Sequence, residues 1–294
     1  MYSGSIVAVV TPMGEAGELD FAAWDRLLDW HADEGTDAVV VCGTTGESPT
    51  VTVDEAVELV ARAQARLRGR LPVIAGTGTN STIGTIERTR RLAQAGADAA
   101  LVVTPYYNKP TQEGLYRHYV AVAEASSIPL ILYNVPSRTG VDLLPDTARR
   151  LAEHPRIVAV KEATGSLQRL AELRELCGDD LEILSGDDPT CADAMLAGAR
   201  GVISVTANVA PRAMHELCVA ALAGDAVRAR ELDGRLQVLH RAMFVEPNPI
   251  PAKWAVQQLG LIPGGIRLPL LPLTAAAQPT VREAMRAAGV SCPA

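Results

Sequence analysis

The stretch Leu130-Ile131-Leu132-Tyr133-Asn134, together with the later stretch Ile157-Val158-Ala159-Val160-Lys161, decides the fold. In both stretches the apolar residues are continuous rather than alternating, which is what a strand buried on both faces requires. Each stretch is followed by a loop rich in Gly, Pro, Thr or Asn and then by a segment with helical spacing. Strict alternation of strand and helix implies parallel strands joined by right-handed crossovers.

The same unit recurs about every 28 residues along most of the chain. Eight apolar runs begin such units, at residues 6–10, 38–41, 73–75, 99–103, 130–133, 157–160, 181–184 and 202–205. Eight parallel units favour an α/β fold in which a (β/α)8 barrel, the TIM barrel, closes on itself. An open doubly wound sheet also accommodates eight units, but no G-x-G-x-x-G motif follows the first run, so we prefer the closed barrel.

Beyond the eighth run the pattern changes to consecutive helical segments without strands. These segments lie near residues 209–222, 225–243, 249–258 and 275–288. An eighth unit needs only one helix, so the others form an appendage. No linker rich in Gly or Ser separates them from the repeats. We therefore predict a catalytic barrel over residues 1–224 and a C-terminal helical region, packed on the barrel, over residues 225–294.

Composition and charge exclude several classes of protein. The net charge is −7 and the 27 basic residues are scattered, which argues against nucleic acid as a partner. No uncharged apolar run is long enough to span a bilayer, and we expect no membrane association. The five cysteines form no C-x-x-C pair, which indicates a reduced, cytoplasmic protein. Asp187 and Asp188 are adjacent where metal ligands are usually staggered, so we expect no metal and no cofactor.

Lys161 is the sharpest chemical signal, because it ends a run that should be buried in the barrel. A lysine amine is nucleophilic only when neutral, and burial disfavours the ammonium, so this position suits Schiff-base chemistry. A lysine at the rim paired with Glu162 is the alternative. Tyr133 ends the neighbouring run one unit earlier, and adjacent strands lie about 4.8 Å apart. A phenol there can relay the protons that imine formation requires.

Three loops at the same end of the predicted barrel carry further candidates. The turn Gly43-Thr44-Thr45-Gly46 offers two hydroxyls and several backbone N–H groups that suit a carboxylate or phosphate, although many such turns are merely structural. Arg138 can bind a second carboxylate through two parallel hydrogen bonds, unless it is an ordinary surface arginine. Tyr106 and Tyr107 are adjacent, so they should point in different directions, and one of them suits the core or an interface.

Taken together, these motifs resemble the 4-hydroxy-tetrahydrodipicolinate synthases, also called dihydrodipicolinate synthases. That family belongs to the pyruvate-dependent aldolases, a group that includes N-acetylneuraminate lyase. The resemblance runs from Gly4 to about Ala288. Its motifs are Gly-Ser-Ile-Val-Ala from Gly4, Val-Thr-Pro-Met from Val10, residues 43–47, Val-Ile-Ala-Gly-Thr-Gly from Val73, Thr-Pro-Tyr-Tyr-Asn from Thr104, Tyr-Asn-Val-Pro-Ser-Arg-Thr-Gly from Tyr133, Lys-Glu-Ala-Thr-Gly from Lys161 and Val-Glu-Pro-Asn-Pro-Ile-Pro from Val245.

The resemblance implies a set of catalytic roles. Lys161 forms an imine with pyruvate, and Tyr133 transfers protons in a relay with Thr44 and Tyr107. In the family the tyrosine that matches Tyr107 enters the active site of a neighbouring subunit. The resemblance thus also implies a homotetramer built from two tight dimers, with small-molecule substrates as its partners.

Substrate binding is implied in the same way. Thr45 and the backbone at Ile203 hold the pyruvate carboxylate, and Gly186 is a further binding residue. Arg138 binds the carboxylate of L-aspartate 4-semialdehyde, whereas sugar-acid lyases of the group read hydroxyls instead. The expected reaction is the synthase reaction of the diaminopimelate route to lysine. The alternatives are another lyase or aldolase of the group, and a barrel that binds anions without chemistry.

Regulation departs from the family pattern. Members that L-lysine inhibits carry an effector site near the positions of Ser48, Asn80 and Tyr106. They also carry polar side chains, His or Glu, at three positions that are apolar or Gly here: Val53, Ala56 and Gly84. Each missing contact leaves a polar group of the effector unpaired, at a cost of about 1–3 kcal/mol. We therefore predict a vestigial effector site and weak or absent inhibition by lysine.

Overall fold

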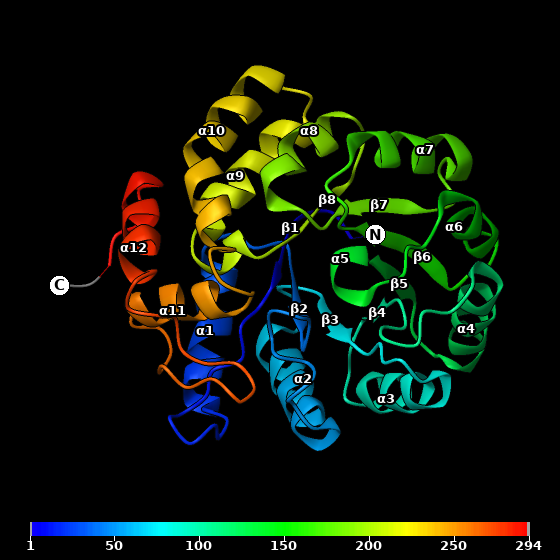
Figure 1. The fold of residues 1–294 in the computed structure, drawn as a ribbon, viewed down its shortest axis with the longest axis horizontal. Helices are drawn as coiled ribbons and strands as arrows, with labels where there is room; N and C mark the ends of the chain where they lie inside the picture. The colour runs from blue at the N-terminus through cyan, green and yellow to red at the C-terminus, as the bar shows by residue number, and fades with distance from the viewer. Residues whose placement is uncertain (1, 293–294) are drawn as a thin grey trace.

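A computed structural model describes residues 2–292, and the strands within this part of the chain form one closed parallel barrel (Figure 1). Each strand pairs with its neighbour in the chain, and the eighth pairs with the first. The fold predicted from the repeat is therefore confirmed. The strands are β1 (Gly4–Ala8), β2 (Ala38–Val41), β3 (Val73–Gly76), β4 (Ala99–Val103), β5 (Leu130–Asn134), β6 (Ile157–Glu162), β7 (Glu182–Ser185) and β8 (Gly201–Ser204).

Helices surround the barrel and connect its strands (Figure 1). They are α1 (Phe21–Asp33), α2 (Val53–Leu67), α3 (Thr82–Gln94), α4 (Gln112–Ala125), α5 (Pro136–Thr139), α6 (Pro145–Ala152), α7 (Leu167–Cys177), α8 (Cys191–Leu196) and α9 (Pro211–Leu222). Short 3-10 turns, η1 (Asp188–Thr190) and η2 (Thr206–Asn208), lie in the loops after β7 and β8. None of the helices in residues 2–292 is long and apolar enough to cross a membrane.

Further helices follow the eighth unit and lie together on one side of the barrel (Figure 1). They are α10 (Ala226–Ala242), α11 (Ile250–Gln258) and α12 (Gln278–Ala287), which begin within three residues of the predicted positions. Helix α10 packs against α9 and α12, and α11 packs against η2. The short segment between α10 and α11 reaches the barrel mouth, where it contributes to the site described below.

The strands divide their side chains between two apolar layers. In β5, Leu130 and Leu132 face the surrounding helices, whereas Ile131 and Tyr133 face the barrel interior. The interior layer also contains residues from the other strands, such as Leu184 of β7. Strand residues alternate between the two faces, so every second residue of a strand points into the barrel. The last inward-facing residue of each strand lies at the C-terminal end of the barrel, where the reacting groups of this fold gather.

Candidate active site

Lys161 and Tyr133 occupy matching positions on adjacent strands. They are direct partners in the register between β5 and β6, and the Lys161 Nζ lies 4.3 Å from the centroid of the Tyr133 ring. Lys161 is 5% exposed and Tyr133 is 7% exposed. Within residues 2–292, the Lys161 amine forms no ion pair and no hydrogen bond. A buried amine beside a phenol, without a counter-ion, is the arrangement that a nucleophilic lysine needs.

Glu162 points away from Lys161, so the alternative of a rim lysine paired with this glutamate is wrong. Its carboxylate accepts hydrogen bonds from the Asn134 side chain at 3.0 Å and from the Thr164 N–H at 2.8 Å. The guanidinium of Arg169 lies 3.8 Å away. Burial raises the pKa of Glu162, and these hydrogen bonds oppose that shift. Strand alternation explains the result, because consecutive residues of β6 face opposite sides.

A cavity of about 240 Å³ opens above this pair. Six of the predicted site residues line it, namely Thr44, Thr45, Tyr133, Arg138, Lys161 and Gly186. Gly186 leaves the space that the lysine needs, because a Cβ at this position would lie 2.8 Å from Lys161 Cε. The volume accommodates a three-carbon keto acid and part of a second small molecule.

The turn after β2 presents the two threonines. Gly46 N–H donates to the Gly43 carbonyl at 3.0 Å, and the Glu47 N–H donates to the Thr44 carbonyl at 3.1 Å. Glu47 has a φ of +59°, a strained conformation for a residue with a side chain. The surrounding structure must therefore hold this turn in place.

Residues of the C-terminal region complete the cavity, and sequence reasoning assigned them no role. Phe244 and Asn248 line it, from the segment between α10 and α11. The Asn248 side-chain N–H donates to the Thr45 hydroxyl at 3.0 Å, and the Asn248 backbone carbonyl accepts from the Arg138 guanidinium at 3.4 Å. The available signal was the Val-Glu-Pro-Asn-Pro-Ile-Pro motif, which supported only the family resemblance.

Arg138 lies in the short helix α5, exposed at the mouth of the cavity. Among the described residues it forms no ion pair, and the one hydrogen bond of its side chain is the contact with the Asn248 backbone carbonyl. A guanidinium with free donors at the mouth can bind a carboxylate of an incoming molecule. Asp187, which also lines the cavity, accepts a hydrogen bond from the Thr190 hydroxyl at 2.7 Å.

The structure does not bring two predicted residues into this cavity. Tyr107 is 88% exposed, has a φ of +73° and is not among the residues that line the cavity. Ile203 is buried in the interior layer of the barrel, and Val205 rather than Ile203 lines the cavity wall beside it. A side chain as exposed as that of Tyr107 cannot join a relay within this chain alone.

The predicted effector residues fall in different places. Ser48 and Tyr106 line a second cavity of about 410 Å³, next to the first, whereas Asn80 does not. The apolar side chain of Val53 lies in its wall. Thr44 and Arg138 line both cavities, so the two spaces are neighbours at the mouth of the barrel.

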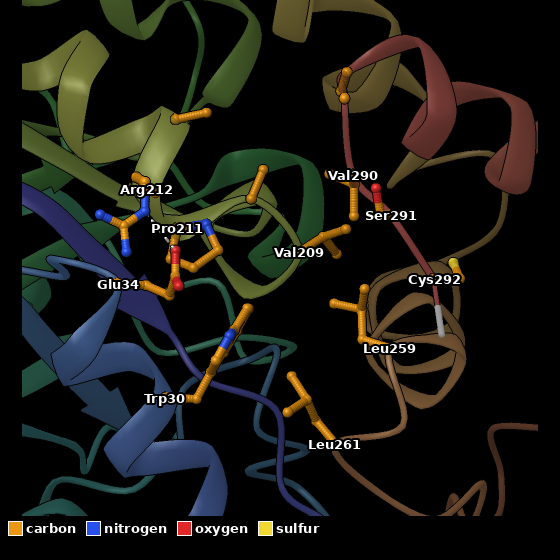
Figure 2. Close-up of a pocket in the computed structure, with 14 residues that line it drawn as sticks. Trp30, Glu34, Val209, Pro211, Arg212, Leu259, Leu261, Val290, Ser291 and Cys292 are labelled. Carbon is orange, nitrogen blue, oxygen red and sulfur yellow. Dashed lines mark hydrogen bonds and ion pairs between the residues drawn. The ribbon is translucent and has the colours of Figure 1, made fainter. Parts of the chain in front are cut away.

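A third cavity, of about 600 Å³, lies between α1, α9 and the C-terminal segment, away from these residues. Figure 2 shows that apolar side chains, including Trp30, Leu259 and Val290, dominate its walls. Its charged groups are Arg212 and Glu34, which pair with each other at 3.0 Å. Its described lining includes the free thiol of the exposed Cys292 but no lysine and no unpaired charge, so the Schiff-base chemistry belongs to the smaller cavity at the barrel mouth.

Comparison with known proteins shows the family of the chain. The model of the dihydrodipicolinate synthetase family matches residues 1–288. The 4-hydroxy-tetrahydrodipicolinate synthase of Azoarcus sp. is 58% identical, with 99% of each chain covered. That of Methylococcus capsulatus is 57% identical, covering 99% of this chain and all of the relative.

Solved structures give the same result. A chloride-inhibited dihydrodipicolinate synthase from Acinetobacter baumannii, complexed with pyruvate, matches with a TM-score of 0.98 and 50% identity, covering 99% of this chain and 100% of that one. A dihydrodipicolinate synthase from Aquifex aeolicus matches with a TM-score of 0.97 and 46% identity over both whole chains. The chain belongs to the dihydrodipicolinate synthetase family and is an enzyme with 4-hydroxy-tetrahydrodipicolinate synthase activity.

Proposed function

We propose that Lys161 forms an imine with pyruvate and that the resulting enamine attacks L-aspartate 4-semialdehyde. The observation that carries this proposal is the buried, unpaired amine of Lys161 beside Tyr133, at the floor of a cavity with Arg138 at its mouth. The related enzyme from Acinetobacter baumannii was solved as a complex with pyruvate. The chemistry is that of lysine biosynthesis through diaminopimelate.

The proposed steps balance without a cofactor. The Lys161 amine attacks the keto carbon of pyruvate, and loss of water from the carbinolamine gives the imine. Tyr133 supplies and removes the protons, and loss of a methyl proton gives the enamine. The enamine carbon then bonds to the aldehyde carbon of the second substrate. The amine of that substrate displaces Lys161 and closes the ring, which releases 4-hydroxy-tetrahydrodipicolinate.

In this proposal Thr45 holds the pyruvate carboxylate. Asn248 donates to the Thr45 oxygen, so the hydroxyl proton of Thr45 is free to donate to a bound anion. Thr44, in the same turn, is the relay partner of Tyr133 in this proposal. In this proposal Gly186 keeps the cavity open beside Lys161. The backbone at Ile203 is proposed as a further contact for the carboxylate, although only Val205, further along the chain, lines the cavity.

Arg138→Ala is the variant that tests the assignment of the second substrate. Removal of one partner of a charge pair typically costs about 2–5 kcal/mol, so kcat/KM for aspartate semialdehyde should fall by roughly 30-fold to several thousand-fold. Borohydride should still trap pyruvate on the enzyme at the wild-type level. Arg138→Lys keeps the charge but loses the planar guanidinium, so its kcat/KM for aspartate semialdehyde should lie between those of the wild type and Arg138→Ala.

Two results would contradict this assignment. If kcat/KM for the semialdehyde is unchanged in Arg138→Ala, another group binds the substrate carboxylate. If pyruvate trapping is lost as well, Arg138 supports the first substrate rather than the second.

We further propose a homotetramer of two tight dimers, in which Tyr107 enters the site of the neighbouring subunit. Its 88% exposure and positive φ support this role, because an aromatic side chain held out from its own chain is suited to contact a partner. The neighbouring Tyr106 would lie at the same interface. We also propose that the enzyme works in the cytoplasm, where the thiols of its cysteines stay reduced.

Mixing two inactive variants tests Tyr107. In a dimer of Tyr107→Phe and Lys161→Met subunits, one site receives an intact lysine from one chain and an intact tyrosine from the other. Co-expression should therefore restore activity well above that of either variant alone. Sedimentation confirms the mixed assembly. If the mixture shows only the average activity of the two variants, Tyr107 does not act in the partner's site.

We propose that residues 1–224 and 225–294 are two structural regions of one functional unit. The second region supplies Phe244 and Asn248 to the cavity, so the barrel alone would lack one wall of the site. Contact of α10 with α9 and of α11 with η2 supports a packed rather than a separable appendage.

A further inference from the structure

A group of polar side chains lies on the outer face of the barrel wall, directly behind Tyr133 and Lys161. The next residues of the two strands, Asn134 of β5 and Glu162 of β6, are register partners, and both are buried. Because consecutive strand residues face opposite sides, their side chains leave the barrel interior and lie on the side of the helices. The Asn134 amide donates to the Glu162 carboxylate at 3.0 Å. A side-chain hydrogen bond therefore joins the two strands immediately next to the reacting pair.

Asp142 and Arg169 complete this group, which we call the outer cluster: Asn134, Asp142, Glu162 and Arg169. The Asn134 amide also donates to Asp142 at 2.7 Å, and Arg169 of α7 binds both carboxylate oxygens of Asp142, at 2.9 and 2.8 Å. The Arg169 guanidinium lies 3.8 Å from the Glu162 carboxylate. With the Thr164 N–H on the other oxygen of Glu162, every carboxylate oxygen of the cluster has a donor. A buried polar network that is fully satisfied in this way is rigid.

The outer cluster also holds the segment that follows Arg138. The Leu143 N–H donates to the side-chain oxygen of Asn134 at 2.9 Å, and the Leu143 carbonyl accepts from Arg169 at 3.4 Å. Arg138 lies in α5, and these contacts tie the segment between α5 and α6 to the end of β5 and to α7. The same side chains therefore anchor the two strand ends and the loop next to the cavity mouth.

The pairing of β5 with β6 contains an irregularity below the reacting pair. Leu130 pairs with Ile157 but Ile131 pairs with Ala159, so the register shifts by one residue between them. Such a shift disrupts the ladder locally, and backbone pairing then specifies the position of the strand ends less strongly than a regular ladder does. The bond between Asn134 and Glu162, at the C-terminal ends of the strands, supplies an additional constraint.

We propose that Glu162 is a positioning residue for the imine chemistry. Through the outer cluster it keeps the Lys161 amine, which lies 4.3 Å from the centroid of the Tyr133 ring, in place for proton transfer. The inference rests on the proposed roles of Tyr133 and Lys161. Glu162 itself is not among the residues that line the cavity, so it acts through the strands rather than on the substrates. Misplacement of reacting groups by about 1 Å can slow a reaction on the order of 10²-fold.

Glu162→Gln tests the proposal, because it keeps the shape of the side chain and removes the charge beside Arg169. The rate of imine formation with pyruvate, measured by quenching with borohydride at successive times, should fall about tenfold to hundredfold. The KM for pyruvate should change by less than about threefold, because the proposed carboxylate contact is at Thr45, in the turn after β2. A thermal melt shows that the variant is folded at the assay temperature.

Glu172→Gln is the matched control. Glu172 is another acidic partner of Arg169, at 3.9 Å on the same helix, but its side chain is 45% exposed and its other contact is with Gln168 of α7. Its replacement should leave the rate of imine formation at the wild-type value. Should Glu162→Gln fail to fold, Arg169→Lys carries the same test. It keeps the charge but loses the two parallel bonds to Asp142, and the expected loss is about threefold to tenfold.

A double-mutant cycle with Tyr133→Phe separates positioning from a general loss of structure. If Glu162 acts through the relative position of the phenol and the amine, its replacement costs little once the phenol is gone. The double variant should then form the imine within about threefold of the rate of Tyr133→Phe alone. The proposal is overturned if the two losses multiply, if Glu162→Gln forms the imine at the wild-type rate, or if Glu172→Gln is slowed equally.

Failure of the proposed function would give a different result. The wild type would then trap no pyruvate, or Tyr133→Phe would form the imine at the wild-type rate, and the role of Glu162 would fall with it. A wild type that traps pyruvate and a slow Tyr133→Phe, together with an unaffected Glu162→Gln, would overturn the positioning role alone.

Discussion

Replacing Lys161 with methionine is expected to lower kcat on the order of 10⁴-fold or more, because the covalent route through the imine is lost. The side chain is 5% exposed and forms no ion pair within residues 2–292. Methionine fills a similar volume and removes an unpaired amine from an apolar layer. The free energy of unfolding should therefore stay equal or rise, which separates loss of chemistry from loss of structure.

The chain makes this test unusually clean, because it contains only three lysines: Lys109, Lys161 and Lys253. Lys109 is exposed in the loop after β4, and Lys253 is buried in an ion pair with Glu47. Borohydride reduction with pyruvate, followed by peptide mass analysis, should place the adduct on Lys161 alone. Lys109→Met is the control and should trap pyruvate normally. An adduct on Lys161→Met, at either remaining lysine, would exclude the proposed mechanism.

The position of Lys161 was predictable because it follows from local sequence alone. An apolar run specifies a buried strand, and the period of two along that strand fixes which side its last residues face. The spacing between Tyr133 and Lys161, one complete unit, then places the two side chains in register on neighbouring strands, as the structure shows. Long apolar runs and regular repeats therefore make both the fold and the positions of Tyr133 and Lys161 predictable from the sequence.

Asn248 was not predictable in the same way. It lies in a proline-rich loop with no periodic pattern, and it reaches Thr45 from a distant part of the chain. Arg169 presents the same difficulty, because an arginine on a helix is normally solvated, and only the packing of α7 against α6 places it beside Asp142 and Glu162. Contacts between segments that are distant in sequence leave no local signal. Tyr107 differs again, since its proposed contact is with another chain.

The buried pair of Glu47 and Lys253 is a third feature that only the structure reveals, and it holds the turn that carries the two threonines. Glu47 is 2% exposed and Lys253 is 3% exposed, and the carboxylate contacts the ammonium directly. The other carboxylate oxygen accepts from the Arg267 N–H at 3.1 Å. Burial lowers the pKa of Lys253, and the charge of Glu47 opposes that shift.

Breaking this pair should be strongly destabilising. Lys253→Met leaves the carboxylate buried without its counter-ion, and the free energy of unfolding should fall by about 3–5 kcal/mol. Glu47→Gln should cost a similar amount for the converse reason. The double variant Glu47→Gln/Lys253→Met removes both charges and should recover most of the loss. Urea unfolding measures all three, and Arg212→Met, which breaks an ion pair at the surface, should be indistinguishable from the wild type.

The double variant separates stability from function. Glu47 holds its positive φ in the same turn that presents Thr44 and Thr45, and the pair ties this turn to α11. Without the ion pair the turn loses this tether, so the KM for pyruvate should rise several-fold while the fold is retained. A double variant with wild-type stability and a wild-type KM would show that the other contacts of the turn, such as those of Asn248 with Thr45 and of Thr11 with the Gly46 carbonyl, are enough to hold it. A double variant as unstable as the single ones would show that the pair contributes a net attraction beyond its desolvation cost, because removal of both charges would then bring no relief.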